Sequence, residues 1–150
     1  MVMKTRMNYR AANPQAFQTM LQLEQYVKTS GIEPALLELI KIRASQLNGC
    51  AFCLDMHTKD ARSMGETEQR IYLLNAWREA EVYTEAERAV LALTEAVTLI
   101  AQNGVADEVY ENVREHFDEK QIVSLIMAIN VINCWNRLAI TTGMTAPARF

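Results

Sequence analysis

Residues 122–132 read Ile-Val-Ser-Leu-Ile-Met-Ala-Ile-Asn-Val-Ile, a run that leaves a helix almost no polar face. Asp118 and Gln121 form a capping pair before this run, and we expect the helix to continue to about residue 141. A helix that is apolar all round must be surrounded by other elements. In a chain of 150 residues, it is either the central helix of a bundle or a helix shared with a second subunit. We favour both together, which predicts a homo-oligomer.

Helical spacing and capping residues divide the rest of the chain into further helices, and no segment has the alternation of a strand. Asn13-Pro14 begins one helix and Pro34 begins the next, and Gly31 and Gly49 mark their ends. The remaining helices are expected at about 50–64, 66–77, 84–103 and 107–116. We therefore predict an all-α fold, a bundle of six to seven helices, in a single domain over residues 1–150.

The composition excludes several classes of protein. Half of the residues are hydrophobic, 22% are charged, and five Gly and three Pro are too few for a disordered or collagen-like chain. The net charge of −3 gives no basic surface for nucleic acid. Three cysteines are too few, and odd in number, for a secreted disulfide scaffold.

The sequence also gives an expectation about location. The first ten residues are basic and polar, without a secretory segment. The run 122–132 is shorter than the roughly 20 apolar residues that span a bilayer. We expect a cytoplasmic protein with neither a membrane nor a nucleic acid as its partner.

The strongest chemical signal is the motif Cys-Ala-Phe-Cys at residues 50–53, followed by His57. The motif begins a helix directly after a glycine-marked helix end, so both sulfurs lie near the positive end of the helix dipole. That position lowers thiol pKa values and lets the pair close a disulfide. Spacings of three and four residues place Cys50, Cys53 and His57 on one helix face. Glu38, on the preceding helix, approaches them if the two helices pack antiparallel.

Magnitudes indicate that these four residues act as a unit. Lowering a thiol pKa from about 8.5 to about 7 raises the thiolate fraction roughly fifteen-fold. The thiolate also becomes about five-fold less nucleophilic, so the net gain in rate is only about three-fold. Proton transfer by a positioned acid or base typically contributes about 10²–10⁴-fold. If the thiolate attacks an O–O bond, the departing alkoxide therefore needs His57 and Glu38.

Two other interpretations of the motif stay open. The cysteines could be small core residues, as we expect for Cys134. Alternatively, Cys50, Cys53 and His57 could be zinc ligands, with His116 or Cys134 completing the shell from a distance. No second C-x-x-C and no H-x-x-x-H accompanies them. We predict no resident metal and no cofactor.

The stretch from Glu38 to His57 has the spacing E-x11-C-x-x-C-x-x-x-H, which resembles the signature of the AhpD-like alkylhydroperoxidases of the carboxymuconolactone decarboxylase superfamily. Residues 59–62 and 133–137 resemble its short, single-domain branch, and the resemblance covers about residues 8–140. It implies the AhpD-like helical fold and an assembly into trimers, hexamers or larger rings. It also implies dithiol peroxidase activity, recycled by a thiol donor such as a lipoyl group or another redox protein.

The resemblance implies a role for each residue of the unit. Cys53 would be the peroxidatic thiolate, Cys50 the resolving thiol, and Glu38 with His57 the proton relay. Position on the helix instead favours Cys50, the cysteine nearer the helix start, as the more acidic one. The family pattern has a second histidine between the cysteines, where this chain has Phe52, so the efficiency and the preferred oxidant are open.

These observations predict an antioxidant oxidoreductase that reduces small organic hydroperoxides. Three alternatives remain. The first is a thiol–disulfide relay or redox sensor that uses the same dithiol. The second is an enzyme of the carboxymuconolactone decarboxylase type, which needs no dithiol. The third is a non-catalytic zinc or interaction module.

Overall fold

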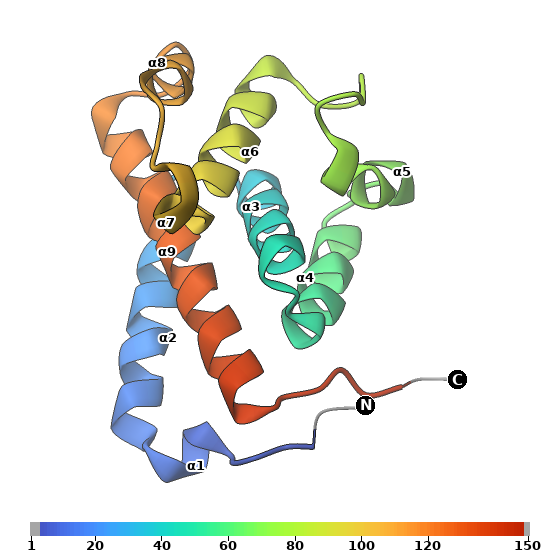
Figure 1. Cartoon of the computed structure of the whole chain (residues 1–150), viewed down its shortest axis with the longest axis vertical. Helices are drawn as coiled ribbons and strands as arrows, with labels where there is room; N and C mark the ends of the chain where they lie inside the picture. The colour runs from blue at the N-terminus through green and yellow to red at the C-terminus, as the bar shows by residue number, and fades with distance from the viewer. Residues whose placement is uncertain (1–3, 149–150) are drawn as a thin grey trace.

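A computed structural model describes residues 4–148, which form helices and no strand (Figure 1). The elements in chain order are α1 (Tyr9–Ala12), α2 (Pro14–Lys28), α3 (Pro34–Asn48), α4 (Ala51–Ser63), α5 (Glu68–Tyr72), the short 3-10 helix η1 (Leu74–Ala76), α6 (Glu85–Thr98), α7 (Ile100–Asn103), α8 (Asp107–Arg114) and α9 (Glu119–Thr142). The all-α prediction is confirmed.

The expected number of helices was too low, because nine α-helices and one 3-10 helix occupy the described residues. The backbone leaves helical geometry at Leu99, with φ −101° and ψ 27°, and this divides the helix expected at 84–103 into α6 and α7. The segment expected at 66–77 likewise divides into α5 and η1. The short α1 was not expected, and the side chain of Asn8 caps it by accepting from the backbone of Arg10 and Ala11.

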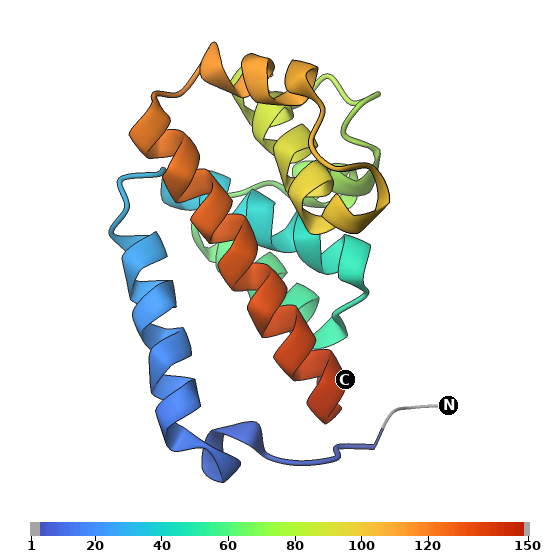
Figure 2. The same cartoon turned by 60° about the vertical axis from the view of Figure 1, so that its left-hand side comes forward.

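Helix α9 is the central element of the bundle. The capping box of Asp118 and Gln121 starts it, as expected, and it packs against α3, α6 and α2. Figure 2 shows α9 running diagonally between α2 on one side and α3 with α6 on the other. Leu125, Ile129 and Ile132 on this helix are fully buried. The prediction of a central helix is therefore confirmed within one chain.

Within residues 4–148, α9 is also the one helix that is long and apolar enough to cross a membrane by length and composition. The run 122–132 alone is shorter than a membrane span, but it lies within a helix of 24 residues. The helix length considered from the sequence was therefore too small. Its most apolar stretch has a mean hydropathy of 1.4, and 56% of that stretch is buried inside the bundle. Its place at the centre of the bundle accounts for its apolar character.

Helix α3 is buried on every side between α4, α6 and α9. Its residues from Leu36 to Ile42 are all buried, and this set includes the charged Glu38 and Lys41. Charged side chains are almost never fully buried unless they are paired. The packing of α3 therefore forces these two side chains to find partners inside the molecule.

The first described residues are tied to the end of α9. The amides of Arg6 and Met7 donate to the carbonyl oxygen of Thr142 at 2.8 and 3.4 Å. Gly143 ends α9 with φ +73°, and a Cβ at this position would lie 2.6 Å from the carbonyl oxygen of Lys4. A side chain at Gly143 is thus excluded both by the backbone conformation and by the backbone of the neighbouring segment at Lys4.

Gly49 provides a matched control for this close approach. It ends α3 with φ +69° and ψ 35°, almost the conformation of Gly143, but a Cβ there would meet nothing within 4 Å. We expect Gly49→Ala to cost about 1 kcal/mol of unfolding free energy. Gly143→Ala should cost at least about 1 kcal/mol more, since the backbone near Lys4 must move. Urea denaturation of both variants measures the difference, and equal losses would contradict the proposed contact.

Candidate active site

The two cysteines lie at the start of α4. Gly49 turns the chain after α3, the amide of Cys50 donates to the carbonyl of Ser45 at 3.0 Å, and Cys50 becomes the N-cap of α4. Cys53 follows in the first turn, with its Sγ 2.9 Å from the Sγ of Cys50. Both cysteines are free thiols, 1% and 2% exposed. The local sequence therefore builds a buried dithiol at a helix N-terminus, as expected.

The dithiol has one acidic and one weakly acidic member. The pKa of Cys50 falls to about 7 because the Cys53 thiol hydrogen-bonds to its sulfur, and this effect outweighs burial. The amide of Asn136 and the charge of His57 lower the pKa of Cys50 further. The pKa of Cys53 is raised strongly by its hydrogen bond with Cys50, by burial and by the negative charge of Cys50. The pair thus holds a single negative charge above about pH 7. The expectation that the cysteine nearer the helix start is the more acidic agrees with this order.

Glu38 and His57 form a buried pair beside the dithiol. Glu38 is 4% and His57 is 5% exposed, and Nδ1 of His57 lies 2.8 Å from Oε2 of Glu38. The antiparallel packing of α3 and α4 that brings them together is the arrangement that the sequence suggested. The structure therefore places all four expected site residues, Cys50, Cys53, His57 and Glu38, in one region.

A second ion pair continues from Glu38 toward the surface. Nζ of Lys41 donates to Oε1 of Glu38 at 3.3 Å and to Oε1 of Glu24 at 2.7 Å. The other oxygen of Glu24 accepts from the indole Nε1 of Trp135 at 3.1 Å. The Glu24–Lys41–Glu38–His57 chain, called the charged network below, joins helices α2, α3 and α4.

The charged network holds Glu38 and Lys41 in their ionised forms. Burial acts to raise the pKa of Glu38, but the hydrogen bonds and charges of His57 and Lys41 outweigh burial and lower this pKa. Burial acts to lower the pKa of Lys41, but the charges and hydrogen bonds of Glu38 and Glu24 raise it instead. Glu38 is therefore a carboxylate at neutral pH and can accept the hydrogen bond from His57.

A buried amide network lies on the other side of the dithiol. Nδ2 of Asn48 donates to the side-chain oxygens of Asn133 and Asn136, both at 2.9 Å. Asn136 donates to Oγ of Ser45 at 3.0 Å, and its amide acts to lower the pKa of both thiols. Asn133 donates to Thr98 at 3.0 Å, and no hydrogen bond joins it to a sulfur among the described residues. Asn136 is thus oriented by its neighbours toward the dithiol.

Sequence reasoning missed Glu24, Lys41 and Asn136 as members of the site. Asn136 lies within 133–137, a stretch noted for its resemblance and not for its chemistry. Glu24 had no signal in the sequence, because its partner Lys41 is 17 residues away. Trp135, in the same stretch as Asn136, donates a hydrogen bond to Glu24.

The dithiol and the charged network share a cavity of about 430 Å³. Its wall includes Cys53 but not Cys50, so Cys53 is the sulfur that a small molecule in the cavity would meet. The remaining lining residues come from α1, α2, α3, α4 with its C-cap residue Met64, and α9: Tyr9, Arg10, Phe17, Leu21, Glu24, Lys28, Glu38, Lys41, Phe52, Met56, His57, Asp60, Met64, Trp135 and Ala139.

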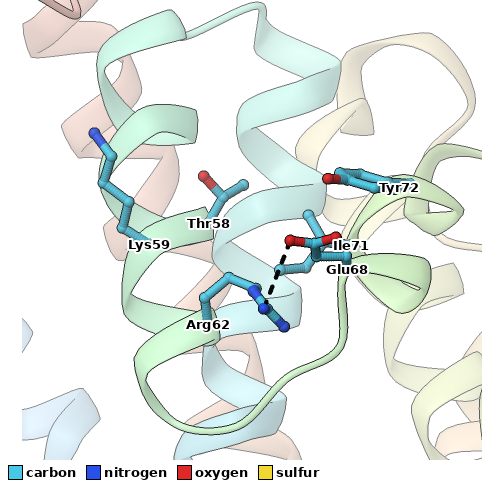
Figure 3. Close-up of a pocket in the computed structure, with 6 residues that line it drawn as sticks. All are labelled: Thr58, Lys59, Arg62, Glu68, Ile71 and Tyr72. Atoms are coloured by element: carbon cyan, nitrogen blue, oxygen red, sulfur yellow. Dashed lines mark ion pairs between the residues drawn. The ribbon is translucent and has the colours of Figure 1, made fainter. Parts of the chain in front are cut away.

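A second depression of about 310 Å³ lies between α4 and α5 (Figure 3). Its lining includes Thr58, Tyr72 and the ion pair of Arg62 with Glu68 at 3.6 Å. The side chain of Lys59 points away from the other five residues drawn. No cysteine or histidine lines this depression, so the candidate chemistry belongs to the cavity beside Cys53.

The residues of the zinc interpretation do not form one ligand set. Within residues 4–148, the group of side chains close enough to share an ion consists of Glu38, His57 and Asp60, and contains neither cysteine. The ammonium of Lys41 already lies 3.3 Å from Glu38 and would repel a cation. His116 is exposed and packs edge-to-face on Phe117, and Cys134 is half-buried. These positions argue against a shared zinc shell.

Fold and site together define an all-helical protein with a buried dithiol beside a carboxylate–imidazole pair. Residues 14–96 match the model of the carboxymuconolactone decarboxylase family. The uncharacterised protein YdfG of Bacillus subtilis is 52% identical over 147 residues, covering 98% of this chain and all of YdfG. The chain therefore belongs to the carboxymuconolactone decarboxylase family and is an AhpD-like member of it.

Solved structures agree with this assignment. One is a protein of unknown function from Agrobacterium tumefaciens, proposed as the antioxidant defence protein AhpD. It is 49% identical, covers 97% of this chain and 100% of its own, and superposes with a TM-score of 0.95. The debrominase Bmp8 shares the fold at 19% identity, with a TM-score of 0.83 over 92% of this chain and 74% of Bmp8. The same fold thus carries more than one chemistry.

Variants of Asn136 and Asn133 test whether Asn136 lowers the pKa of the dithiol. Asn136→Asp replaces a donor by a carboxylate next to the sulfurs, and we expect it to raise the first thiol pKa by roughly one unit or more. Asn133→Asp makes the same change one helical turn away and should shift the first thiol pKa far less. The ultraviolet absorbance of the thiolate, measured against pH, gives the midpoint of the first thiol titration. All variants carry Cys134→Ser, so that only the dithiol contributes. Without either change, the first step should fall near pH 7, and equal shifts in the two variants would contradict the role of Asn136.

Proposed function

We propose that this chain is a dithiol peroxidase that reduces organic hydroperoxides in antioxidant defence. The observation that carries the proposal is the position of Cys53. Its sulfur lines the cavity that His57 and Glu38 also line, and it lies 2.9 Å from the sulfur of Cys50. A peroxide in this cavity would meet a nucleophile, a proton donor and a second thiol together.

The reaction has three steps. Cys53 passes its proton to Cys50, and its thiolate attacks the distal oxygen of the hydroperoxide. The O–O bond breaks, the alkoxide leaves as an alcohol with a proton from His57, and Cys53 becomes a sulfenic acid. Cys50 then attacks the sulfenic sulfur, water leaves, and a disulfide forms. A dithiol donor returns two electrons and two protons, and it is oxidised to its own disulfide.

The acid–base part of the reaction depends on Glu38 being ionised. A carboxylate accepting from Nδ1 of His57 holds the imidazole in one orientation and stabilises its protonated form. Lys41 keeps Glu38 charged, and Glu24 keeps Lys41 in place. Glu24 and Lys41 are therefore positioning residues, which act on the peroxide only through Glu38 and His57.

The lining of the cavity and the family support a proposal for the partners of the reaction. The aromatic and aliphatic lining favours organic hydroperoxides over small polar oxidants, and Phe52 adds to this lining where the family pattern has a histidine. A lipoyl group or another redox protein would supply the dithiol that regenerates the pair. We also propose that the protein acts in the cytoplasm as a homo-oligomer, a trimer or a hexamer.

A thiol–disulfide relay or redox sensor is the second candidate. The near-complete burial of both sulfurs, 1% and 2% exposed, supports it because burial restricts turnover. The two functions share a disulfide but differ in rate. A peroxidase reduces many equivalents of hydroperoxide per dithiol when a thiol donor is in excess, whereas a sensor stays oxidised.

A stoichiometric pulse of cumene hydroperoxide tests the proposed function directly. We expect the reduced protein to lose two hydrogens and two free thiols, measured by intact mass and thiol count, and dihydrolipoamide should reverse both losses. Cys53→Ser should abolish the reaction. Cys50→Ser should stop at a sulfenic acid on Cys53, which dimedone traps. Cys134→Ser is the control and should react normally. Thiols that survive the pulse would refute a peroxidase.

The role of Glu38 and Lys41 predicts a pH dependence. Because Lys41 lowers the pKa of Glu38, its removal lets Glu38 protonate at a higher pH, and the acid limb of the peroxidase pH profile should move upward. Lys41→Met leaves two carboxylates without a cation, so the charge-balanced double variant Glu24→Gln/Lys41→Met is the better probe.

Lys41→Arg is the control for this experiment, since it retains the positive charge and should keep the acid limb near its original position. An unchanged pH profile in the double variant would show that Lys41 only fills space.

Glu38→Gln should lower the peroxidase rate about 10²-fold or more, because the carboxylate that orients His57 is lost.

A further inference from the structure

Among the described residues, two cations on the cavity wall have no acidic partner. Arg10 and Lys28 both line the cavity, and neither takes part in an ion pair within the part of the chain that the structure describes. The buried carboxylates of the same wall are different, because Glu24 and Glu38 are both bound by Lys41. Arg10 and Lys28 are therefore available to a ligand, whereas Lys41 is already engaged by two carboxylates.

The two cations lie near opposite ends of the face that α2 presents to the cavity, Lys28 on α2 itself and Arg10 on α1. Phe17, Leu21, Glu24 and Lys28 line the cavity at helical spacing along α2. Phe17 and Lys28 are eleven residues apart, which corresponds to about 16 Å along a helix axis. The guanidinium of Arg10 lies 5.1 Å from the ring centroid of Phe17. Arg10 thus marks the Phe17 end of the cavity, and Lys28 marks the other end.

Arg10 is also held against an aromatic wall. Tyr9 and Phe17 pack edge-to-face at 6.2 Å, and Phe17 packs in the same way on Trp135 at 6.1 Å. The Arg10 guanidinium lies over both Tyr9, at 5.9 Å, and Phe17. Such contacts orient a guanidinium without neutralising its charge. The wall therefore ends in a positioned cation at Arg10 and reaches Glu24 of the charged network through Trp135.

We propose that the preferred substrate is an organic hydroperoxide with an aromatic or similarly broad apolar body and a carboxylate, which Arg10 binds at the Phe17 end of the cavity. This inference rests on the proposed function and adds the class of substrate. The apolar body would lie along Phe17 and Trp135, with its hydroperoxide directed to Cys53. A volume of about 430 Å³ is in the range of small-molecule sites, and hydrogen peroxide would leave most of this space unfilled.

The charges near the reacting sulfur favour an anionic group at a distance from it. The dithiol carries a negative charge, Glu38 is ionised, and Oδ2 of Asp60 lies 4.0 Å from Nδ1 of His57. A carboxylate close to Cys53 would be repelled by all three. A carboxylate at Arg10 avoids this repulsion, because the aromatic wall stands between Arg10 and the charged network.

A matched pair of hydroperoxides tests the inference. Cumene hydroperoxide and its para-carboxylate derivative have the same reacting group and differ in one charge. We expect the carboxylate to oxidise the dithiol roughly two- to five-fold faster in second-order rate constant at low ionic strength, the advantage of one exposed ion pair. High salt should reduce this ratio. Arg10→Met should bring the ratio to one or below, and Arg10→Lys should restore part of it.

Measuring the ratio in each variant removes any general effect on folding or on the thiols. Lys28→Met is the comparison, and it should keep the preference because Lys28 lies at the other end of α2. Equal rates for the two hydroperoxides, or a preference that survives Arg10→Met, would overturn the substrate inference and leave the peroxidase intact. If neither hydroperoxide oxidises the dithiol, the proposed function fails and the inference fails with it.

Discussion

The burial of Glu38 and Lys41 on one turn of α3 is the constraint on which the rest of the site depends. An unpaired ion in a protein interior costs several kcal/mol, so each of these side chains needs partners within reach. α4 supplies His57 and α2 supplies Glu24, whose second oxygen is bound by Trp135 of α9. One pair of buried charges thus fixes how three helices pack against α3. A shift of any of them would leave a charge uncompensated.

The dithiol lies where this polar region meets the amide network of Asn48, Asn133 and Asn136. The two networks treat the sulfurs differently. Asn136 provides neutral hydrogen bonds that favour a thiolate, whereas the charged network provides the ionised carboxylate that orients His57. The pKa of Cys50 therefore depends on both networks, through the amide of Asn136 and through the charge of His57.

The sequence was sufficient wherever the deciding interactions are local. Helical periodicity and the capping pair at Asp118 gave α9, and spacings of three and four residues placed Cys50, Cys53 and His57 on one face. Contacts distant in sequence escaped it. The Glu24–Lys41 pair depends on how α2 lies against α3, and the break at Leu99 follows no breaker residue. The rank of the thiol pKa values was available from the helix start alone, since the N-cap position already favours a thiolate at Cys50.

The low pKa of Cys50 also has a consequence for the energetics of the disulfide. Every interaction that stabilises the thiolate favours the reduced dithiol over the disulfide. Each pKa unit by which the fold acidifies a thiol is worth about 1.4 kcal/mol, or about 30 mV in the reduction potential of a two-electron couple. Asn136 and His57 therefore make the disulfide a stronger oxidant. The same interactions that stabilise a thiolate in the reduced protein therefore make reduction of the disulfide more favourable.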